Sequence, residues 1–139
     1  MGLAMVTYFK SQGFRVASCA TTIEGAKRGN PDFAFSCDVA DRKQVQEGIA
    51  QVVQSLGMID CLINNAGLAG TNSLDQSDDD SFWSAILNVN LNGTYYMSKY
   101  ILPHLKDGGR IVNIASVLAH KGVPDQTAYC AAKHGVLGF

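Results

Sequence analysis

Short apolar runs alternate with longer segments of helical periodicity along this chain. Each apolar run has the length and composition of a buried strand, and polar or glycine-containing stretches bound it. Strands that alternate with helices in this way favour an α/β fold built on a parallel sheet. The predicted strands are residues 14–19, 33–37, 58–63 and 109–115.

Helical spacing is clearest in the segment after Asp41, which has the pattern of a helix N-cap with Gln44 three residues later. Apolar residues then recur on one stripe from Val45 to Leu56, and Gly57 closes the predicted helix. This helix carries no candidate chemistry, so we interpret it as part of the scaffold.

The longest helix is predicted from about Asp79 to Leu105, with three aspartates at 78–80 near its positive end. Its middle contains several residues that form helices poorly, each costing up to about 1 kcal/mol relative to alanine. A sequence that required only a helix would avoid them, so this stretch indicates a second requirement. The residues are Asn88, Asn90, Asn92 and Gly93.

Composition and charge narrow the class of protein. The chain has 139 residues, enough for one domain with a real core. Hydrophobic residues make up 47%, charged residues 17%, and the formal net charge is -1, which gives no basic face for nucleic acid. No apolar run approaches the roughly 20 residues that span a bilayer, and no signal-peptide pattern is visible. We therefore expect a cytoplasmic protein with no nucleic-acid or membrane partner.

The cysteines have no metal-binding or redox-motif spacing, so no metal site is predicted. We interpret them as buried, reduced thiols of a cytosolic protein. They are Cys19, Cys37, Cys61 and Cys130.

Candidate chemistry is concentrated in residues 110–133. Ser116 follows the last predicted strand, and a loop then leads to a helix that contains Tyr129 and Lys133. The last two residues are four apart, so a helix places them on one face, one turn apart. A neighbouring ammonium favours the phenolate form of a tyrosine. A hydroxyl facing a phenol and an ammonium is therefore a proton-transfer site in outline.

At these residues the chain resembles the short-chain dehydrogenase/reductase family, whose active site has the serine and the Y-x-x-x-K motif. Further motifs occur in the family's order: D-V at 38–39, N-N-A-G at 64–67 and N-x-N-L at 88–91. The resemblance is strongest to bacterial 3-oxoacyl-thioester reductases and to hydroxybutyrate and polyol dehydrogenases. It implies a Rossmann-like, doubly wound parallel sheet and an NAD(P)-dependent oxidoreductase.

The resemblance also implies a role for each catalytic candidate. Hydride would pass between a nicotinamide and a small-molecule carbonyl or secondary alcohol, with Tyr129 as the acid or base. Ser116 would hydrogen-bond the substrate oxygen, and Lys133 would support Tyr129 and hold the nicotinamide ribose. Asn90 would lie at a helix irregularity and support a proton relay through water. His120 lies in the loop after the serine, where it could contact a substrate. We do not include it among the predicted site residues.

The implied cofactor site lies along the carboxyl ends of the strands. Relatives begin with a strand and a glycine-rich turn that brings backbone N–H groups to the pyrophosphate, and only Gly2 of that turn is present here. The Asp38 side chain and the Val39 backbone would face the adenine. The remaining cofactor-binding residues would be Asn65, Ala66, Gly67, Tyr129 and Lys133.

The residues after the predicted strand 14–19 bear on the choice of cofactor. An acidic residue there would hydrogen-bond a ribose hydroxyl and repel a phosphate. The chain has Ala20, Thr21 and Thr22 instead, so NADP(H) is slightly favoured over NAD(H). No residue is a clear phosphate-binding arginine, because Lys27 and Arg28 can equally be ordinary surface charges.

Compared with its relatives, the chain lacks a first strand and the C-terminal strands of the family. We expect residues 1–139 to form a single, partial dinucleotide-binding and catalytic domain of a homo-oligomer, a tetramer or a dimer. The absent first strand would lie between strands 14–19 and 58–63. If the chain truly starts at Met1, either those two strands pair directly or a partner supplies a strand. The alternative, which we favour, is that the sequence is part of a longer enzyme. The alternative function is a truncated, catalytically inactive dehydrogenase-like binding or interaction protein.

Overall fold

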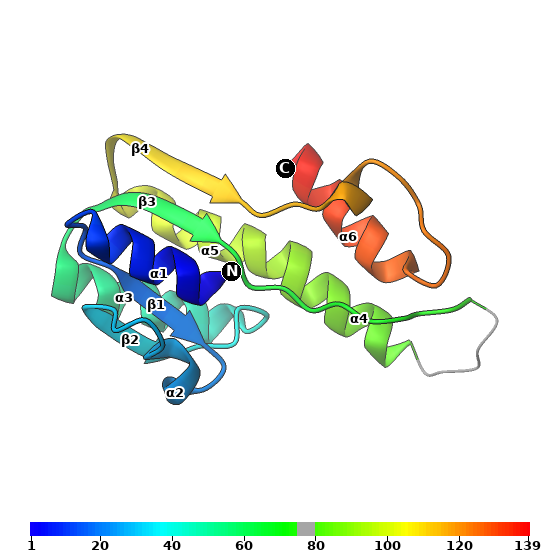
Figure 1. The fold of residues 1–139 in the computed structure, drawn as a ribbon, viewed down its shortest axis with the longest axis horizontal. Helices are drawn as coiled ribbons and strands as arrows, with labels where there is room; N and C mark the ends of the chain where they lie inside the picture. Colours follow the sequence, from blue (N-terminus) through cyan, green and yellow to red (C-terminus); the bar gives the residue numbers. More distant parts are fainter. Residues whose placement is uncertain (75–79) are drawn as a thin grey trace.

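The computed structural model describes residues 1–74 and 80–139 and confirms the α/β class (Figure 1). All strand pairing within named strands is parallel, and the arrows in Figure 1 point toward the same end of the molecule. This end therefore gathers the carboxyl ends of the strands. The strands are β1 (Ala17–Ala20), β2 (Phe33–Ser36), β3 (Ile59–Asn64) and β4 (Leu105–Asn113).

Helices alternate with the strands as predicted. A five-residue π-helical turn, Asn88–Asn92, joins two of the helices into one long rod, which crosses the molecule in Figure 1. No described helix is long and apolar enough to cross a membrane. The helices are α1 (Gly2–Ser11), α2 (Ile23–Ala26), α3 (Arg42–Leu56), α4 (Ser81–Leu87), α5 (Gly93–Ile101) and α6 (Thr127–Gly138).

The strands form two separate pairs. Strand β1 pairs with β2, strand β3 pairs with β4, and no ladder joins β1 to β3 in the described part of the chain. The direct pairing considered for strands 14–19 and 58–63 is therefore wrong for this structure. Both pairs instead pack on one hydrophobic core, which contains Phe35 from β2 and Leu62 from β3. Side-chain packing, and not strand hydrogen bonding, holds the two halves of the sheet together.

The starts of the first and last strands differ most from the prediction, and the other strand boundaries differ by at most two residues. The first strand begins at Ala17 and not at residue 14, because Phe14 continues the turn after α1 and packs edge-on against Phe9, 5.6 Å between ring centroids. The last strand runs from Leu105 to Asn113, because Leu105 already pairs with β3 at Ile59.

The predicted long helix also needs correction. It is interrupted by the π-helical turn, and its α-helical part ends at Ile101. A short 3-10 turn that contains Pro103 follows, and the predicted end, Leu105, belongs to β4. The predicted start at Asp79 lies outside the described residues, as do the first two of the three aspartates.

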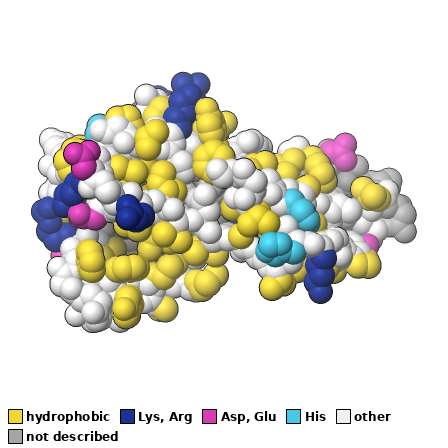
Figure 2. Space-filling view, turned by 90° about the horizontal axis from the view of Figure 1, so that it is seen from above, with side chains coloured by type: hydrophobic (Ala, Val, Ile, Leu, Met, Phe, Trp, Pro, Cys, Tyr) yellow, Lys and Arg dark blue, Asp and Glu magenta, His cyan; other side chains and the backbone are white. Residues whose placement is uncertain are grey.

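Several large hydrophobic side chains are exposed to solvent. Figure 2 shows them between a small number of charged side chains over much of the face seen from above. Val112 of β4, for example, is 43% exposed. The expectation that every cysteine is buried is wrong for Cys61 of β3, which is exposed, and for Cys19 of β1, which is only half-buried.

Helix α3 shows how sequence signals fix one scaffold element. The Asp41 carboxylate accepts hydrogen bonds from the backbone N–H groups of Lys43 (2.8 Å) and Gln44 (3.2 Å), as the N-cap pattern predicts. These hydrogen bonds lower the pKa of Asp41, and the bond from Gln44 contributes most. Gly57 ends the helix at a φ of +76°. In the helix interior Gly48 lies against Phe35, and a Cβ atom at this position would collide with the phenyl ring.

We predict that Gly48→Ala destabilises the protein, because the added methyl group overpacks the contact between α3 and β2. Overpacking of this kind costs about 1–3 kcal/mol, which exceeds the helix propensity gained by replacing glycine. Urea unfolding followed by circular dichroism measures the change. Gly138→Ala is the matched control, since a Cβ atom at that glycine would have no neighbour within 4 Å. An equal effect of the two substitutions would contradict the prediction.

Candidate active site

The carboxyl ends of β3 and β4 are tied together by Asn64. Its side-chain Nδ2 donates to Oδ1 of Asn113 on β4 (2.8 Å) and to Oγ of Ser98 on α5 (3.0 Å). Its carbonyl oxygen accepts from the backbone N–H of Ile114 (3.0 Å). One amide side chain therefore joins two strands and a helix at the point where the candidate site begins.

The π-helical turn carries Asn90, whose side chain is almost completely buried at 1% exposure. Its Nδ2 donates to the carbonyl oxygens of Leu68 (2.7 Å) and Ile86 (2.9 Å). Its Oδ1 has no hydrogen-bond partner among the described residues. An unsatisfied buried acceptor costs about 1–3 kcal/mol, so this oxygen is suited to a donor that the protein itself does not supply.

Lys133 is buried beside Tyr129. Its side chain is 5% exposed, and Nζ donates to the carbonyl oxygen of Ile114 (2.7 Å). Nζ also lies 5.7 Å from the centroid of the Tyr129 ring. Burial lowers the pKa of Lys133, because desolvation disfavours the charged ammonium. The phenol and the ammonium are thus neighbours, as their spacing on a helix predicts.

Gly67 lies next to the side chains of both Asn90 and Lys133. A Cβ atom at this glycine would lie 2.9 Å from Asn90 Oδ1 and 3.9 Å from Lys133 Nζ. The unpartnered amide oxygen and the buried ammonium therefore flank the same glycine, which comes from the turn after β3. The structure brings together Asn90, Gly67, Tyr129 and Lys133, which lie far apart in the sequence.

Ser116 lies between β4 and the turn Val117–Ala119, which packs against α6. The Ser116 Oγ accepts a hydrogen bond from the backbone N–H of Leu118 (3.2 Å). Acceptance by the oxygen leaves the hydroxyl hydrogen available for donation to a ligand. The serine is thus placed at the strand end beside the helix that carries the tyrosine and the lysine.

The cofactor candidates lie at the same edge of the sheet. Helix α1 begins at Gly2, and a Cβ atom there would be 3.2 Å from Nδ2 of Asn65. The positive end of α1 therefore faces the 64–67 turn, an arrangement that suits a phosphate group. Figure 1 shows the N-terminus near the tips of the strand arrows.

Asp38 and Val39 occupy a tight turn after β2. The Asp38 carboxylate accepts a hydrogen bond from the backbone N–H of Ala40 (2.9 Å). The backbone N–H of Asp38 donates to Oε1 of Gln44 (2.9 Å). The Val39 side chain is buried against Gly93, where a Cβ atom would be 2.8 Å from Val39 Cγ2. Val39 can thus offer a ligand only its backbone.

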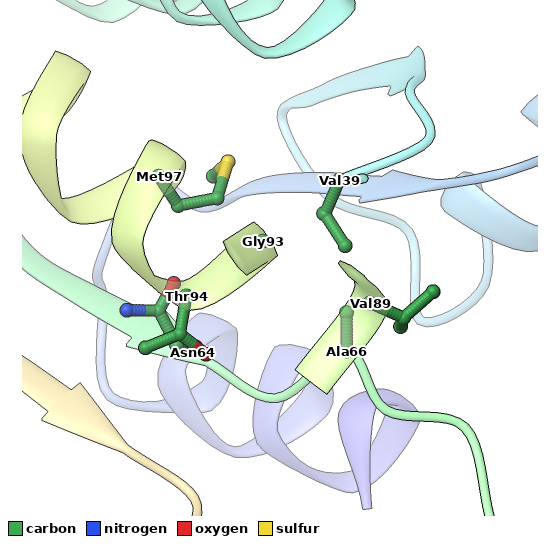
Figure 3. Close-up of a pocket in the computed structure, with 7 residues that line it drawn as sticks. All are labelled: Val39, Asn64, Ala66, Val89, Gly93, Thr94 and Met97. Atoms are coloured by element: carbon green, nitrogen blue, oxygen red, sulfur yellow. The ribbon is translucent and has the colours of Figure 1, made fainter. Parts of the chain in front are cut away.

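A small void lies beneath this edge. Figure 3 shows side chains from the ends of β2 and β3 and from the long helix around it, with Asn64 and Thr94 as its polar members. Its volume is about 10 Å³. This is room for at most one water molecule, so the void belongs to the core and is not a substrate pocket. It is lined by Val39, Asn64, Ala66, Val89, Gly93, Thr94 and Met97.

Two polar connections that hold the site in place were not predicted from the sequence. One is the Asn64, Ser98 and Asn113 cluster, and the other joins Asn72 to Thr127. A polar residue at a strand end was the only signal for the first. The second joins residues that are 55 positions apart, and no local pattern distinguishes it.

A parallel α/β fold with a polar site at the carboxyl edge of its strands belongs to the class of open α/β proteins, which bind their ligands at that edge. Within that class, the chain belongs to the short chain dehydrogenase family, whose family model matches residues 1–139. The family resemblance and the Rossmann-type fold expected from the motifs are therefore confirmed.

Individual relatives agree with this family. The chain is 36% identical to the 3-oxoacyl-[acyl-carrier-protein] reductase FabG of Haemophilus influenzae, over 100% of this chain and 60% of the relative. It is 37% identical to an acetoacetyl-CoA reductase of Shinella zoogloeoides, over 100% of this chain and 60% of that protein. The chain thus spans about three fifths of the length of these relatives.

Solved structures give the same result. A short-chain dehydrogenase/reductase mutant from Serratia marcescens superposes with a TM-score of 0.90 at 26% identity, covering 99% of this chain and 60% of that one. The aldohexose dehydrogenase of Thermoplasma acidophilum, in ligand-free form, superposes with a TM-score of 0.85 at 31% identity, covering 99% and 54%.

The lowered pKa of Lys133 predicts a pH dependence of stability. Between the folded-state pKa and the unfolded value of 10.5, the folded state binds fewer protons than the unfolded chain. The contribution of Lys133 to the free energy of unfolding therefore increases as pH rises between these two pKa values. Lys133→Met removes the contribution, so the stability of wild type relative to the variant should rise with pH.

Urea unfolding at a series of pH values up to about 10, within the window set by the lysine reference pKa, measures this difference. Lys43→Met is the control, because the Lys43 side chain is 84% exposed, so the same substitution there removes an ammonium that is not buried. Parallel pH curves for wild type and Lys133→Met would contradict the prediction.

Proposed function

We propose that the protein is an NAD(P)-dependent oxidoreductase that transfers hydride between a nicotinamide and a small-molecule carbonyl or secondary alcohol, with Tyr129 as the acid or base. One observation carries the proposal. The unpartnered Oδ1 of Asn90 and the buried ammonium of Lys133 meet at Gly67, with the Tyr129 ring beside them. Keeping both polar groups buried costs stability, and catalysis is a reason for retaining them.

The chain's own residues fit a dinucleotide. The first turn of α1, beginning at Gly2, offers backbone N–H groups next to Asn65. The exposed backbone of Ala66 and Gly67 lets a ligand approach closely. When bound, the nicotinamide supplies the hydride chemistry. Residues 1–139 would then contribute to one dinucleotide-binding and catalytic domain.

The proposed proton chemistry assigns these side chains the roles that the family resemblance implies. In the reductive direction Ser116 donates its hydroxyl hydrogen to the substrate carbonyl oxygen and orients it. Tyr129 transfers its phenolic proton to that oxygen as the carbonyl carbon is reduced. The Lys133 ammonium stabilises the phenolate left behind. Asn90 Oδ1 accepts a hydrogen bond from a water molecule that leads the replacement proton toward Lys133.

The relatives guide the choice of substrates for assay. Their names describe reductases of 3-oxoacyl and acetoacetyl thioesters and a D-threitol dehydrogenase. We therefore choose an acetoacetyl thioester and a panel of simple ketones for reduction, and polyols for oxidation.

The decisive substitution is Tyr129→Phe, which removes the phenolic proton and keeps the ring. We expect kcat/KM for NADPH-dependent ketone reduction to fall at least about 100-fold, the usual lower bound for loss of a general acid. The dissociation constant for NADPH should stay within about threefold, because the phenol contributes little to ground-state binding.

Tyr8→Phe is the control for this substitution, since Tyr8 is 60% exposed on α1. NADPH binding without turnover on any assayed substrate would contradict the oxidoreductase proposal. That outcome would instead support a dehydrogenase-like binding protein.

The end of β1 supports a modest preference for NADP(H). Thr21 is exposed there, and its backbone oxygen accepts from Ser36 Oγ (2.9 Å). Thr22 is engaged as the N-cap of α2, where its hydroxyl accepts from Gly25 N–H (3.1 Å). No carboxylate is present at residues 20–22 to repel a ribose phosphate.

We predict that Thr21→Asp shifts the preference toward NADH, because a carboxylate repels the phosphate and hydrogen-bonds a ribose hydroxyl. The ratio of kcat/KM for NADPH to that for NADH should fall about tenfold or more, equivalent to about 1.4 kcal/mol. Thr22→Ser, which keeps the N-cap hydroxyl, should leave the ratio unchanged. A wild-type protein with a strong NADH preference would show that this interpretation of residues 20–22 is wrong.

A further inference from the structure

The loop after β3 is fastened to the start of helix α6. Asn72, only 7% exposed, donates its backbone N–H to the carbonyl oxygen of Asp125 (2.8 Å). The Thr127 hydroxyl donates to the Asn72 backbone oxygen (2.8 Å) and contacts its side-chain Oδ1. Asn72 also forms a parallel β-bridge with Gln126. Thr127 is the first residue of α6, so these bonds hold the helix at its N-terminal end.

The same loop is held at its other end by the candidate catalytic asparagine. Its first residue, Leu68, accepts a hydrogen bond from Asn90 Nδ2 (2.7 Å). In its middle, Gly70 packs so closely on Phe82 of α4 that a Cβ atom would collide with the ring. We call residues 68–73 the strap. The strap is hydrogen-bonded to the π-helical turn, packs against α4 and is hydrogen-bonded to the N-terminal end of α6.

The direct contact between α4 and α6 is apolar, and larger side chains such as Phe82, Trp83 and Tyr129 pack around its centre. Ile86 packs against Ala128 and Ala132, and all three are completely buried. Apolar contact is non-directional, so this packing by itself does not select hydrogen-bonded positions along the helix axis. Directional hydrogen bonds at the N-terminal end of α6 add a constraint of that kind.

We propose that Asn72 and Thr127 are positioning residues that set the axial position of α6, and thereby the place of the Tyr129 hydroxyl relative to Asn90. This inference rests on the proposed function. Tyr129 is two residues beyond Thr127, so a shift at the first turn of α6 moves the phenol directly. A misplacement of about 1 Å can cost about 100-fold in rate without contact between the altered residue and the substrate.

Thr127→Val tests the proposal, because valine keeps the shape of threonine and removes the hydroxyl. We expect kcat for ketone reduction to fall about 10- to 100-fold, while KM and the NADPH dissociation constant change less than about threefold. Thr127→Ser restores the hydroxyl and should recover kcat to within about threefold. Thr7→Val is the matched control, since the exposed Thr7 hydroxyl donates within its own helix, to the carbonyl oxygen of Leu3 (3.1 Å).

A second readout does not depend on turnover. The ring resonances of Tyr129, assigned by their loss in Tyr129→Phe, should move in Thr127→Val and return in Thr127→Ser. If the wild type shows no turnover, the proposed function fails, and these resonances still decide the positioning role. Unchanged kcat and unchanged Tyr129 resonances in folded Thr127→Val would overturn the inference.

If Thr127→Val does not fold, Asn72→Ala replaces it. That variant loses the side-chain acceptor and keeps the backbone one, so it should give a smaller change in the same direction. No change in kcat or in the Tyr129 resonances of folded Asn72→Ala would then overturn the inference.

Discussion

The hydrogen bonds of Asn64 are the constraint on which the candidate site depends. Its side chain reaches Asn113 on β4 and Ser98 on α5, and its carbonyl oxygen holds the peptide of Ile114. The carbonyl oxygen of Ile114 in turn accepts from Lys133 Nζ. A short chain of bonds therefore leads from the end of β3 to the buried ammonium. Because these groups are shielded from water, each lost bond would leave a partner unsatisfied.

The class of fold and the candidate residues were predictable from sequence because they depend on local patterns. Asp41 caps its helix and Gly57 ends it through neighbours in the chain, and Tyr129 and Lys133 meet through helical spacing alone. The boundaries of β1 and β4 were not predictable in the same way. They depend on packing of Phe14 on Phe9 and on the pairing of distant strands, which no short window contains.

The π-helical turn illustrates both sides of this comparison. Its poor helix formers indicated a second requirement, and the structure shows the irregularity expected from the family resemblance. Which atoms Asn90 would bind was not visible in the sequence, because Leu68 is 22 residues away and Ile86 is bound through its backbone. The same holds for Asn72, whose partner Thr127 is 55 residues distant. Loop residues gain such roles only after the scaffold has brought their partners close.

The division of the sheet into two pairs bears on the motions of this chain. Since no strand hydrogen bond crosses between β1 and β3, opening one pair breaks no ladder bond of the other. Local unfolding tends to follow such contiguous units, each with its own free energy of opening. The β1–β2 half carries the residues proposed to read the cofactor's adenosine end, whereas the β3–β4 half positions the proton-transfer groups. The shared hydrophobic core still couples the two halves, so recognition of the nucleotide and alignment for chemistry would reside in parts of the molecule that are joined by side-chain packing and not by a strand ladder.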